Sequence, residues 1–242
     1  MFRMFQNISP VVKNILIINI LFYVAQWTMP SFMQNLELYP LISEDFKPWQ
    51  LATHFFMHSP FSIGHIFFNM FALVIFGPHL EKVWGPQRFL SYYILCALGA
   101  ALLHLGVNYI RIEGIEATLS EGELELFKSS AYEAWSHGQN FIDPVLAELN
   151  ILHHSPMLGA SGAVFGLLAA FGYLFPNTEL MLLFPPIPIK AKYFVIGYAV
   201  LELYLGFANN PGDNVAHFAH LGGALVGILL VLYWGKSRNH FF

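Results

Sequence analysis

Four polar side chains stand inside long apolar stretches of the sequence. They are His65, Asn69, Ser161 and His220. A polar group in a membrane helix is costly, so its presence there points to function. A serine hydroxyl becomes a useful nucleophile when an imidazole accepts its proton, and the oxyanion that follows needs fixed hydrogen-bond donors. Ser161 and His220 therefore supply the residue types of a nucleophile and its base.

The other two residues, and the sequence around Ser161, supply candidate oxyanion donors. His65 and Asn69 are four residues apart, so they project from one face of a helix and can both donate hydrogen bonds. Ser161 lies in Gly159-Ala160-Ser161-Gly162 at a predicted helix start, where free backbone N–H groups and the helix dipole favour negative charge. The backbone amide of Ser161 is a third candidate donor.

Glycine spacing predicts that the helices carrying Ser161 and His220 pack closely, because small residues four apart let membrane helices approach. The two pairs are Gly162 with Gly166, and Gly223 with Gly227. His217 competes with His220 for the role of base, since the two lie three residues apart on one helix face. Only His220 is followed by glycine at the third position, so we expect His217 to be a structural or gate residue.

Other ionisable residues in apolar surroundings have simpler interpretations. We expect His54 and His58 to pack a loop, and Glu202 to lie near the outer end of its helix, partly wet or protonated. His153 and His154 are adjacent and so face different directions, and no carboxylate or thiolate cluster is spaced to complete a metal shell. We therefore expect no metal and no cofactor.

The composition places the chain in a membrane. Of the 242 residues, 56% are hydrophobic and 11% charged, and the mean hydropathy is +0.55, whereas soluble domains carry about 25% charged residues. The net charge of -4 is small, so we expect no nucleic-acid partner. Cys96 is the single cysteine, which excludes an internal disulfide.

Six apolar windows are each long enough, at about 20 residues, to cross the ~30 Å hydrocarbon core. They lie at about 11–29, 63–81, 88–109, 157–175, 192–209 and 215–234. We therefore predict an all-α polytopic membrane protein, with 1–242 forming a single domain of six transmembrane helices. The first window continues to about residue 29 without a cleavage site, which is typical of a retained anchor.

The lysines and arginines predict the orientation of this bundle. Eight of the eleven flank connections on one side: Arg3, Lys13, Lys82, Arg88, Lys190, Lys192, Lys236 and Arg238. The positive-inside rule then puts both termini in the cytoplasm. With a rise of 1.5 Å per residue, His65, Ser161 and His220 lie roughly 3 to 8 Å below the outer helix ends, and Asn69 one turn deeper. The site is thus predicted to open to the external or periplasmic side.

Two long external loops interrupt the bundle. The loop at about 30–62 is rich in aromatic residues, which favours a segment that dips into the membrane interface. The acidic insertion at about 110–156 contains two helix-start signals, a capping box at Ser120 and Glu123 and the pair Asp143-Pro144. We predict two short helices outside the membrane. The short tails and the lack of a visible organelle-targeting segment favour a bacterial inner membrane.

Four motifs, in order, resemble those of the rhomboid family of intramembrane serine proteases, across residues 11 to 234. They are His65-x-x-x-Asn69, Gly77-x-x-x-Glu81-x-x-x-Gly85-x-x-x-Phe89, Gly159-Ala160-Ser161-Gly162 and Ala219-His220-x-x-Gly223-x-x-x-Gly227. The resemblance implies a serine endopeptidase that cuts transmembrane proteins near the outer face and lets them enter past the helix at 192–209. The lipid bilayer and transmembrane substrates are then its partners.

The resemblance also implies residue roles. Ser161 and His220 would form a catalytic dyad without a third carboxylate, and His65, Asn69 and the Ser161 amide would stabilise the oxyanion. Phe165 occupies the position where the family places an aromatic ring against the catalytic histidine. The first loop departs from the family pattern, because Trp49 is followed by Gln50 where relatives often have arginine.

Two other functions are compatible with parts of the sequence. A non-catalytic rhomboid-like protein would bind or guide membrane proteins, but such relatives usually lack the serine or the histidine, and this chain has both. A proton-coupled or metal transporter would use some of the eleven histidines, yet the related halves and broken helices common in transporters are not visible.

Overall fold

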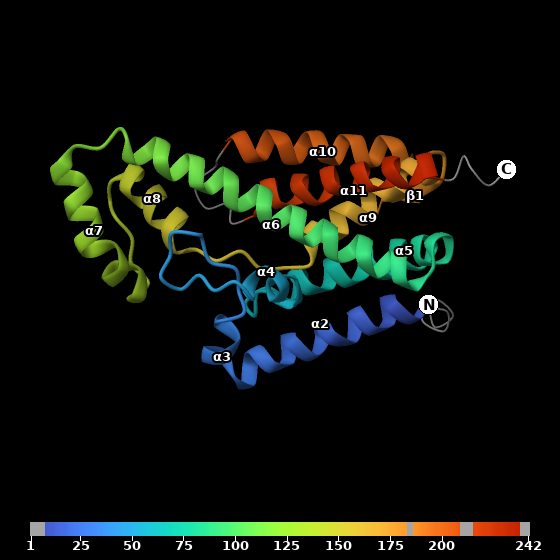
Figure 1. Cartoon of the computed structure of the whole chain (residues 1–242), viewed down its shortest axis with the longest axis horizontal. Helices are drawn as coiled ribbons and strands as arrows, with labels where there is room; N and C mark the ends of the chain where they lie inside the picture. Colours follow the sequence, from blue (N-terminus) through green and yellow to red (C-terminus); the bar gives the residue numbers. More distant parts are fainter. Residues whose placement is uncertain (1–7, 183–185, 209–214, 238–242) are drawn as a thin grey trace.

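The computed structural model describes residues 8–182, 186–208 and 215–237, which form a helical bundle with a small β-hairpin (Figure 1). The bundle helices are α2 (Pro10–Thr28), α5 (Ile63–Trp84), α6 (Pro86–Glu116), α9 (Ser161–Leu174), α10 (Ala191–Ala208) and α11 (His217–Ser237). Within the described ranges, five of them are long and apolar enough to cross a membrane, and α9 is a shorter apolar helix of 14 residues. The prediction of an all-α polytopic membrane fold is confirmed.

The short helix α9 is enclosed by the others. It packs against α5, α6, α10 and α11, and every residue from Gly162 to Gly172 is buried. At 1.5 Å per residue its length is about 21 Å, which is less than the ~30 Å of a hydrocarbon core. α9 is therefore too short to cross that layer alone.

The start of α9 differs from the prediction, since the helix begins at Ser161 and not at residue 157. Met157 pairs with Leu38 of the first loop in an antiparallel bridge, with backbone N···O distances of 2.9 and 2.7 Å. Gly159 has a φ of 123°, a conformation that glycine adopts at little cost. These tertiary contacts hold the segment extended, so Ser161 is the first helical residue and its depth does not follow from the predicted start.

Close contacts at glycines join α9 to α11 and α6, as the spacing predicts. A Cβ atom on Gly223 would lie 1.9 Å from the carbonyl oxygen of Gly162, and one on Gly162 would lie 2.3 Å from the Cβ of Ala100. Gly166 meets Cys96 in the same way, at 2.4 Å from its sulfur. Any side chain at these positions would therefore separate the helix backbones.

The motif residue Glu81 links α5 to the start of α2. Its buried carboxylate accepts hydrogen bonds from the backbone N–H groups of Val11 and Val12, each at 3.1 Å, and from the hydroxyl of Ser9. The first N–H groups of a helix have no partner inside the helix and favour a nearby negative charge. Glu81 thus caps α2 from a neighbouring helix.

Beyond the bundle, α6 continues to Glu116, seven residues past its predicted end at 109. It is followed by α7 (Glu121–Ser136) and α8 (Pro144–His154). The capping box at Ser120 and the Asp143 cap both form as predicted. The two expected helices are therefore present. In Figure 1 they lie at the end of the bundle opposite the start of α2 and the end of α11.

The first loop contains short helices around a buried glutamine. These are α3 (Pro30–Gln34), α4 (Gln50–Thr53) and η1 (His54–Phe56). The Gln50 side chain is fully buried and bonds four backbone groups, two as acceptor and two as donor: the N–H groups of Tyr39 and Lys47 and the carbonyls of Asn35 and Asp45. Gln50 thus organises the loop in which the family often has arginine.

The connection between α9 and α10 is an antiparallel hairpin of β1 (Glu179–Met181) and β2 (Pro188–Lys190), with Glu179 opposite Lys190. The hairpin lies at the end of the bundle where α2 begins (Figure 1). Most described lysines and arginines belong to elements that meet at this end: Lys13, Lys82, Arg88, Lys190, Lys192 and Lys236. Arg3 and Arg238 lie outside the described residues.

Candidate active site

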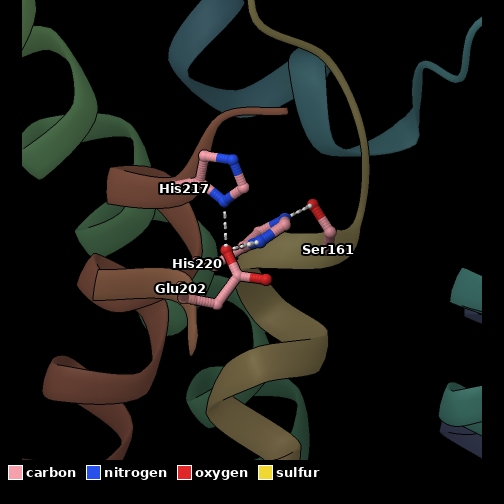
Figure 2. A network of polar contacts seen from close by, with 4 residues as sticks. All are labelled: Ser161, Glu202, His217 and His220. Carbon is pink, nitrogen blue, oxygen red and sulfur yellow. Dashed lines mark hydrogen bonds and ion pairs between the residues drawn. The ribbon is translucent and has the colours of Figure 1, made fainter. Parts of the chain in front are cut away.

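Ser161 and His220 meet where α9 and α11 begin. Ser161 is the first residue of α9 and His220 the fourth of α11. The serine Oγ lies 2.8 Å from Nε2 of the imidazole (Figure 2). The contact of Gly162 with Gly223, directly after Ser161 on α9 and about one turn after His220 on α11, holds the two helices at this approach. The pair therefore has the geometry of a nucleophile and its general base.

The His220 ring is held on its face as well as on its edges. Phe165, one turn after Ser161 on α9, stacks on it with a centroid distance of 4.1 Å and an interplanar angle of 8°. Phe165 in turn contacts Tyr198 of α10 at 5.0 Å. The aromatic contact that the family resemblance implies is thus present in this chain, and it restricts rotation of the imidazole.

His65 approaches Ser161 from α5 across Gly159. A Cβ atom on Gly159 would lie 2.7 Å from His65 Nε2 and 3.7 Å from Ser161 Oγ, so only glycine leaves room for the imidazole. The backbone N–H of Ser59 donates to His65 Nδ1 at 3.3 Å. A neutral imidazole that accepts at Nδ1 carries its hydrogen on Nε2. His65 therefore presents an N–H donor beside the nucleophile.

Asn69 lies one turn further along α5 and is buried. Its Nδ2 donates to the backbone carbonyl of His65 at 2.8 Å. This bond uses one of the two Nδ2 hydrogens. The structure thus joins Asn69 to His65, on the same face of α5, and its contact with the reaction centre stays a prediction.

A buried carboxylate faces the other edge of the His220 ring. Oε2 of Glu202 lies 2.8 Å from Nδ1 of His220 and 2.7 Å from Nδ1 of His217 (Figure 2). Glu202 is only 4% exposed, so the expectation of a partly wet carboxylate is wrong. The face of α10 that carries it turns toward α11, which the position of Glu202 along the helix did not reveal.

These three residues also have the donor types of a metal site. One donor atom from each of Glu202, His217 and His220 lies within 4.8 Å of the other two. The hydrogen bonds between the carboxylate and both imidazoles already satisfy those atoms. The donors therefore have partners of their own without an ion.

The two loop histidines are buried and support the segment before Ser161. His54 is 1% exposed and its carbonyl accepts the Gly159 N–H at 3.0 Å, while His58 is fully buried beside His65 with a ring distance of 5.1 Å. Burial lowers the pKa of His54 to about 4 and that of His58 to about 3. Both imidazoles are therefore neutral near pH 7, as suits the packing role expected for them.

A small pocket opens beside the nucleophile. Small side chains and glycines line much of it: Ala97, Ala100, Gly159, Gly162, Ala216 and Ala219. Ser161 is also part of its wall. The pocket is about large enough for one water molecule next to Ser161.

The family of this chain follows from its match to a model of a protein family. The model described as the Rhomboid domain matches residues 45–111 and 133–237, which is more than half of the chain. The chain belongs to the rhomboid family. This match includes His65, Asn69, Ser161, Glu202 and His220.

Several curated proteins are similar to this rhomboid chain. RHOMBOID-like protein 12, mitochondrial, of Arabidopsis thaliana is 31% identical over 219 residues, covering 88% of this chain and 52% of the relative. Rhomboid protein 1, mitochondrial, of Saccharomyces cerevisiae is 29% identical over 213 residues, covering 87% and 49%. Rhomboid protease AarA of Providencia stuartii is 26% identical over 189 residues, covering 75% and 54%. The chain spans about half the length of the curated relatives it matches.

Two relationships are not predictable from the sequence pattern: the contact of Glu202 with His220, and the role of Gln50 inside the first loop. The signal for Glu202 was a carboxylate inside an apolar helix, which is a functional hint by itself. Its distance from His220, 18 residues in the chain, gave no reason to pair them. For Gln50, the sequence indicates only that arginine is missing after Trp49, and not that the glutamine side chain bonds four backbone groups.

Proposed function

We propose that this chain is an intramembrane serine endopeptidase, with Ser161 as nucleophile and His220 as general base. The observation that carries the proposal is the 2.8 Å contact between Ser161 Oγ and His220 Nε2. Membership of the rhomboid family supports it, since the similar proteins include a bacterial one named a protease. The activity of the whole protein is proposed on the same basis.

The chemistry follows from where the protons lie. Ser161 Oγ attacks a peptide carbonyl carbon while its proton moves to His220 Nε2, and His220 then protonates the leaving amine as the C–N bond breaks. Water then attacks the acyl-enzyme, with His220 accepting its proton and returning one to Ser161. This second half requires access to water, which fits a site at the amino ends of α9 and α11.

Three donors are proposed for the oxyanion of the tetrahedral intermediate. His65 contributes Nε2–H, Ser161 its backbone N–H at the start of α9, and Asn69 an Nδ2 hydrogen. Preorganised donors of this kind are typically worth about 10²- to 10³-fold in rate each. The amino end of α9 adds the positive end of its dipole.

The substrates we propose are transmembrane proteins cut near the outer membrane face. Serine and histidine lie where α9 and α11 start, and small residues line the space beside the serine. Among the described residues, six lysines and arginines belong to the end of the bundle where α2 begins. By the positive-inside rule that end faces the cytoplasm, so the site opens on the external side.

The kind of membrane that holds the chain is addressed by its similar proteins. The chain is an integral multi-pass membrane protein, and its apolar exposed side chains on α2, α5 and α10 face lipid. The mitochondrial names of two similar proteins argue against the predicted bacterial inner membrane.

Labelling with a fluorophosphonate tests the proposal and separates it from a non-catalytic binding role. An activated serine displaces fluoride and bonds to the phosphorus through Oγ. We expect labelling at Ser161 in the purified chain, and none in His220→Ala. A chain that cleaves nothing and stays unlabelled would support the binding protein.

A further inference from the structure

The proposed chemistry uses one edge of the His220 ring, and a buried carboxylate occupies the other edge. Ser161 lies at Nε2 and Glu202 at Nδ1, with 2.8 Å at both contacts (Figure 2). The side chain of Glu202 is 5% exposed and that of His220 is 11% exposed. A charge placed here acts in a medium of low dielectric constant, where its effect on a neighbouring charge is strong.

Both histidines contact the same carboxylate oxygen. Oε2 of Glu202 lies 2.7 Å from Nδ1 of His217 and 2.8 Å from Nδ1 of His220. A carboxylate oxygen accepts from two N–H groups at once, and the two contacts are of nearly equal length, 2.7 and 2.8 Å. A protonated Oε2 would instead have to donate to one ring and accept from the other. The geometry therefore favours an ionised Glu202 and a hydrogen on Nδ1 of each ring.

This arrangement determines the form of His220. With the hydrogen on Nδ1, a neutral imidazole has an unprotonated Nε2. That nitrogen is the one next to Ser161 Oγ. The ring is thus already in the form that accepts the serine proton.

We propose that Glu202 is the positioning residue of a Ser161–His220–Glu202 triad, an inference that rests on the proposed function. When Ser161 Oγ bonds to the substrate carbonyl carbon, its proton moves to His220 Nε2. The Nδ1 hydrogen stays on His220 and Glu202 gains no proton. The carboxylate stabilises the imidazolium that forms, as in other serine hydrolases with a third carboxylate. This departs from the dyad that the family resemblance implies.

The alternative is that Glu202 has a purely structural role, and a test must distinguish that role from positioning of His220. Within α10, the buried residues are Ala191 and Glu202 alone. The hydrogen bonds of Glu202 therefore also help to anchor α10, most of whose side chains are exposed or only partly buried. An anchor would change folding stability and substrate binding, while a positioning residue changes the rate of the serine step.

The experiment uses the full chain in detergent with a transmembrane model substrate. Glu202→Gln keeps the shape of the side chain and removes the charge. We expect kcat to fall about 100-fold or more, with KM within about threefold. Fluorophosphonate labelling of Ser161 should slow in parallel, because it needs the same base. Glu202→Asp restores the charge and should recover part of kcat.

Glu81→Gln is the matched control. Glu81 and Glu202 are both 4% exposed glutamates in membrane helices, but Glu81 caps α2 and does not touch His220. We expect the control to lower the melting temperature and leave the labelling rate of the folded protein unchanged. Loss of charge in a buried helix is then distinguished from loss of the contact with His220.

Two results would overturn the inference. One is a kcat for Glu202→Gln within about threefold of the unchanged chain. The other is a loss of activity that follows unfolding, with an unchanged labelling rate in the folded fraction. If Glu202→Gln does not fold, Glu202→Asp decides: a lower kcat at constant KM supports the triad, and an unchanged kcat contradicts it. Ser161→Ala tests the proposed function independently of Glu202. If Ser161→Ala is inactive while Glu202→Gln keeps its activity, the serine protease assignment stands and the triad is wrong.

Discussion

The histidines around Ser161 differ in which ring nitrogen carries the hydrogen. His65 accepts the Ser59 amide at Nδ1 and so presents a donor at Nε2. His220 donates from Nδ1 to Glu202 and so presents an acceptor at Nε2. Acyl transfer needs one of each, an acceptor for the serine proton and a donor for the oxyanion. Hydrogen bonds remote from the reaction centre thus set the two roles.

At this scale Gly159 is a residue that leaves no room for a side chain. In Gly159→Ala, the new Cβ would lie 2.7 Å from His65 Nε2 at a backbone φ of 123°. We expect the imidazole to be displaced and cleavage to fall by about 10²-fold, the typical effect of losing one oxyanion donor. Turnover of a transmembrane substrate measures this.

Gly138→Ala is the control for backbone strain. Gly138 also has a positive φ, of 67°, but lies between α7 and α8 with open space around it. It should lose about 1–2 kcal/mol of stability and keep full turnover. Equal loss of turnover in both variants would contradict the assignment of Gly159 to the site.

At the scale of helices, the α9–α11 contact brings the serine to its base. A Cβ at Gly223 would lie 1.9 Å from the Gly162 carbonyl oxygen, a backbone atom that cannot move aside. We expect Gly223→Ala to lower the free energy of unfolding by about 1–3 kcal/mol, as overpacking does, and to reduce cleavage strongly. Thermal melting and cleavage assays in detergent report the two effects.

Gly235→Ala on the same helix serves as its control, because among the described residues nothing lies within 4 Å of that position. Alanine favours a helix over glycine by roughly 1 kcal/mol, so stability should hold or rise slightly. A Gly223→Ala variant as stable and active as Gly235→Ala would show that the contact is dispensable.

How far the sequence predicts these helices depends on the source of the signal. Apolar windows and cap residues are local, so the long helices, α7 and α8 were foreseen from them. The start of α9 was not, because the pairing of Met157 with Leu38 and the backbone at Gly159 are tertiary features. Glycine spacing did predict the α9–α11 contact, since it encodes packing within the chain itself.

The residues of the site also differ in how far local sequence predicts them. Ser161 and His220 could be singled out as polar residues in apolar helices with suitable local sequence. Glu202 was recognised as unusual but not paired, because its helix shares no small-residue pattern with α11. The rotation of a largely lipid-facing helix about its axis depends on a few contacts, and those are visible only in three dimensions.

At the scale of the whole molecule, buried ionisable groups of the first loop make the stability of the fold depend on pH. Burial lowers the pKa values of His54 and His58 to about 4 and about 3, and raises the pKa of Glu37 to about 7. Below pH 6.5 the unfolded chain binds protons on both histidines that the folded chain does not. Their contribution to stability is therefore complete above pH 6.5 and lost as the pH falls toward 4 and 3.

Glu37 acts in the opposite direction, because the folded state holds its proton between pH 4.5 and 7 while the unfolded state loses it. Two histidines outweigh one carboxyl group, so we expect the melting temperature to fall from pH 6.5 to 4, by a free energy on the order of a few kcal/mol. Glu37→Gln should make the acid loss steeper. A melting temperature that rises on acidification would refute this account of the loop.

The most direct measurement compares cleavage of a transmembrane substrate by the unchanged chain and by Ser161→Ala, reconstituted in the same lipid vesicles. Ser161 lies at the surface of a small pocket, so the substitution should leave the melting temperature nearly constant. We predict that cleavage disappears in the variant, because no other group faces His220 Nε2 in the described structure. Undiminished cleavage by Ser161→Ala would contradict the assignment of this chain as a serine protease.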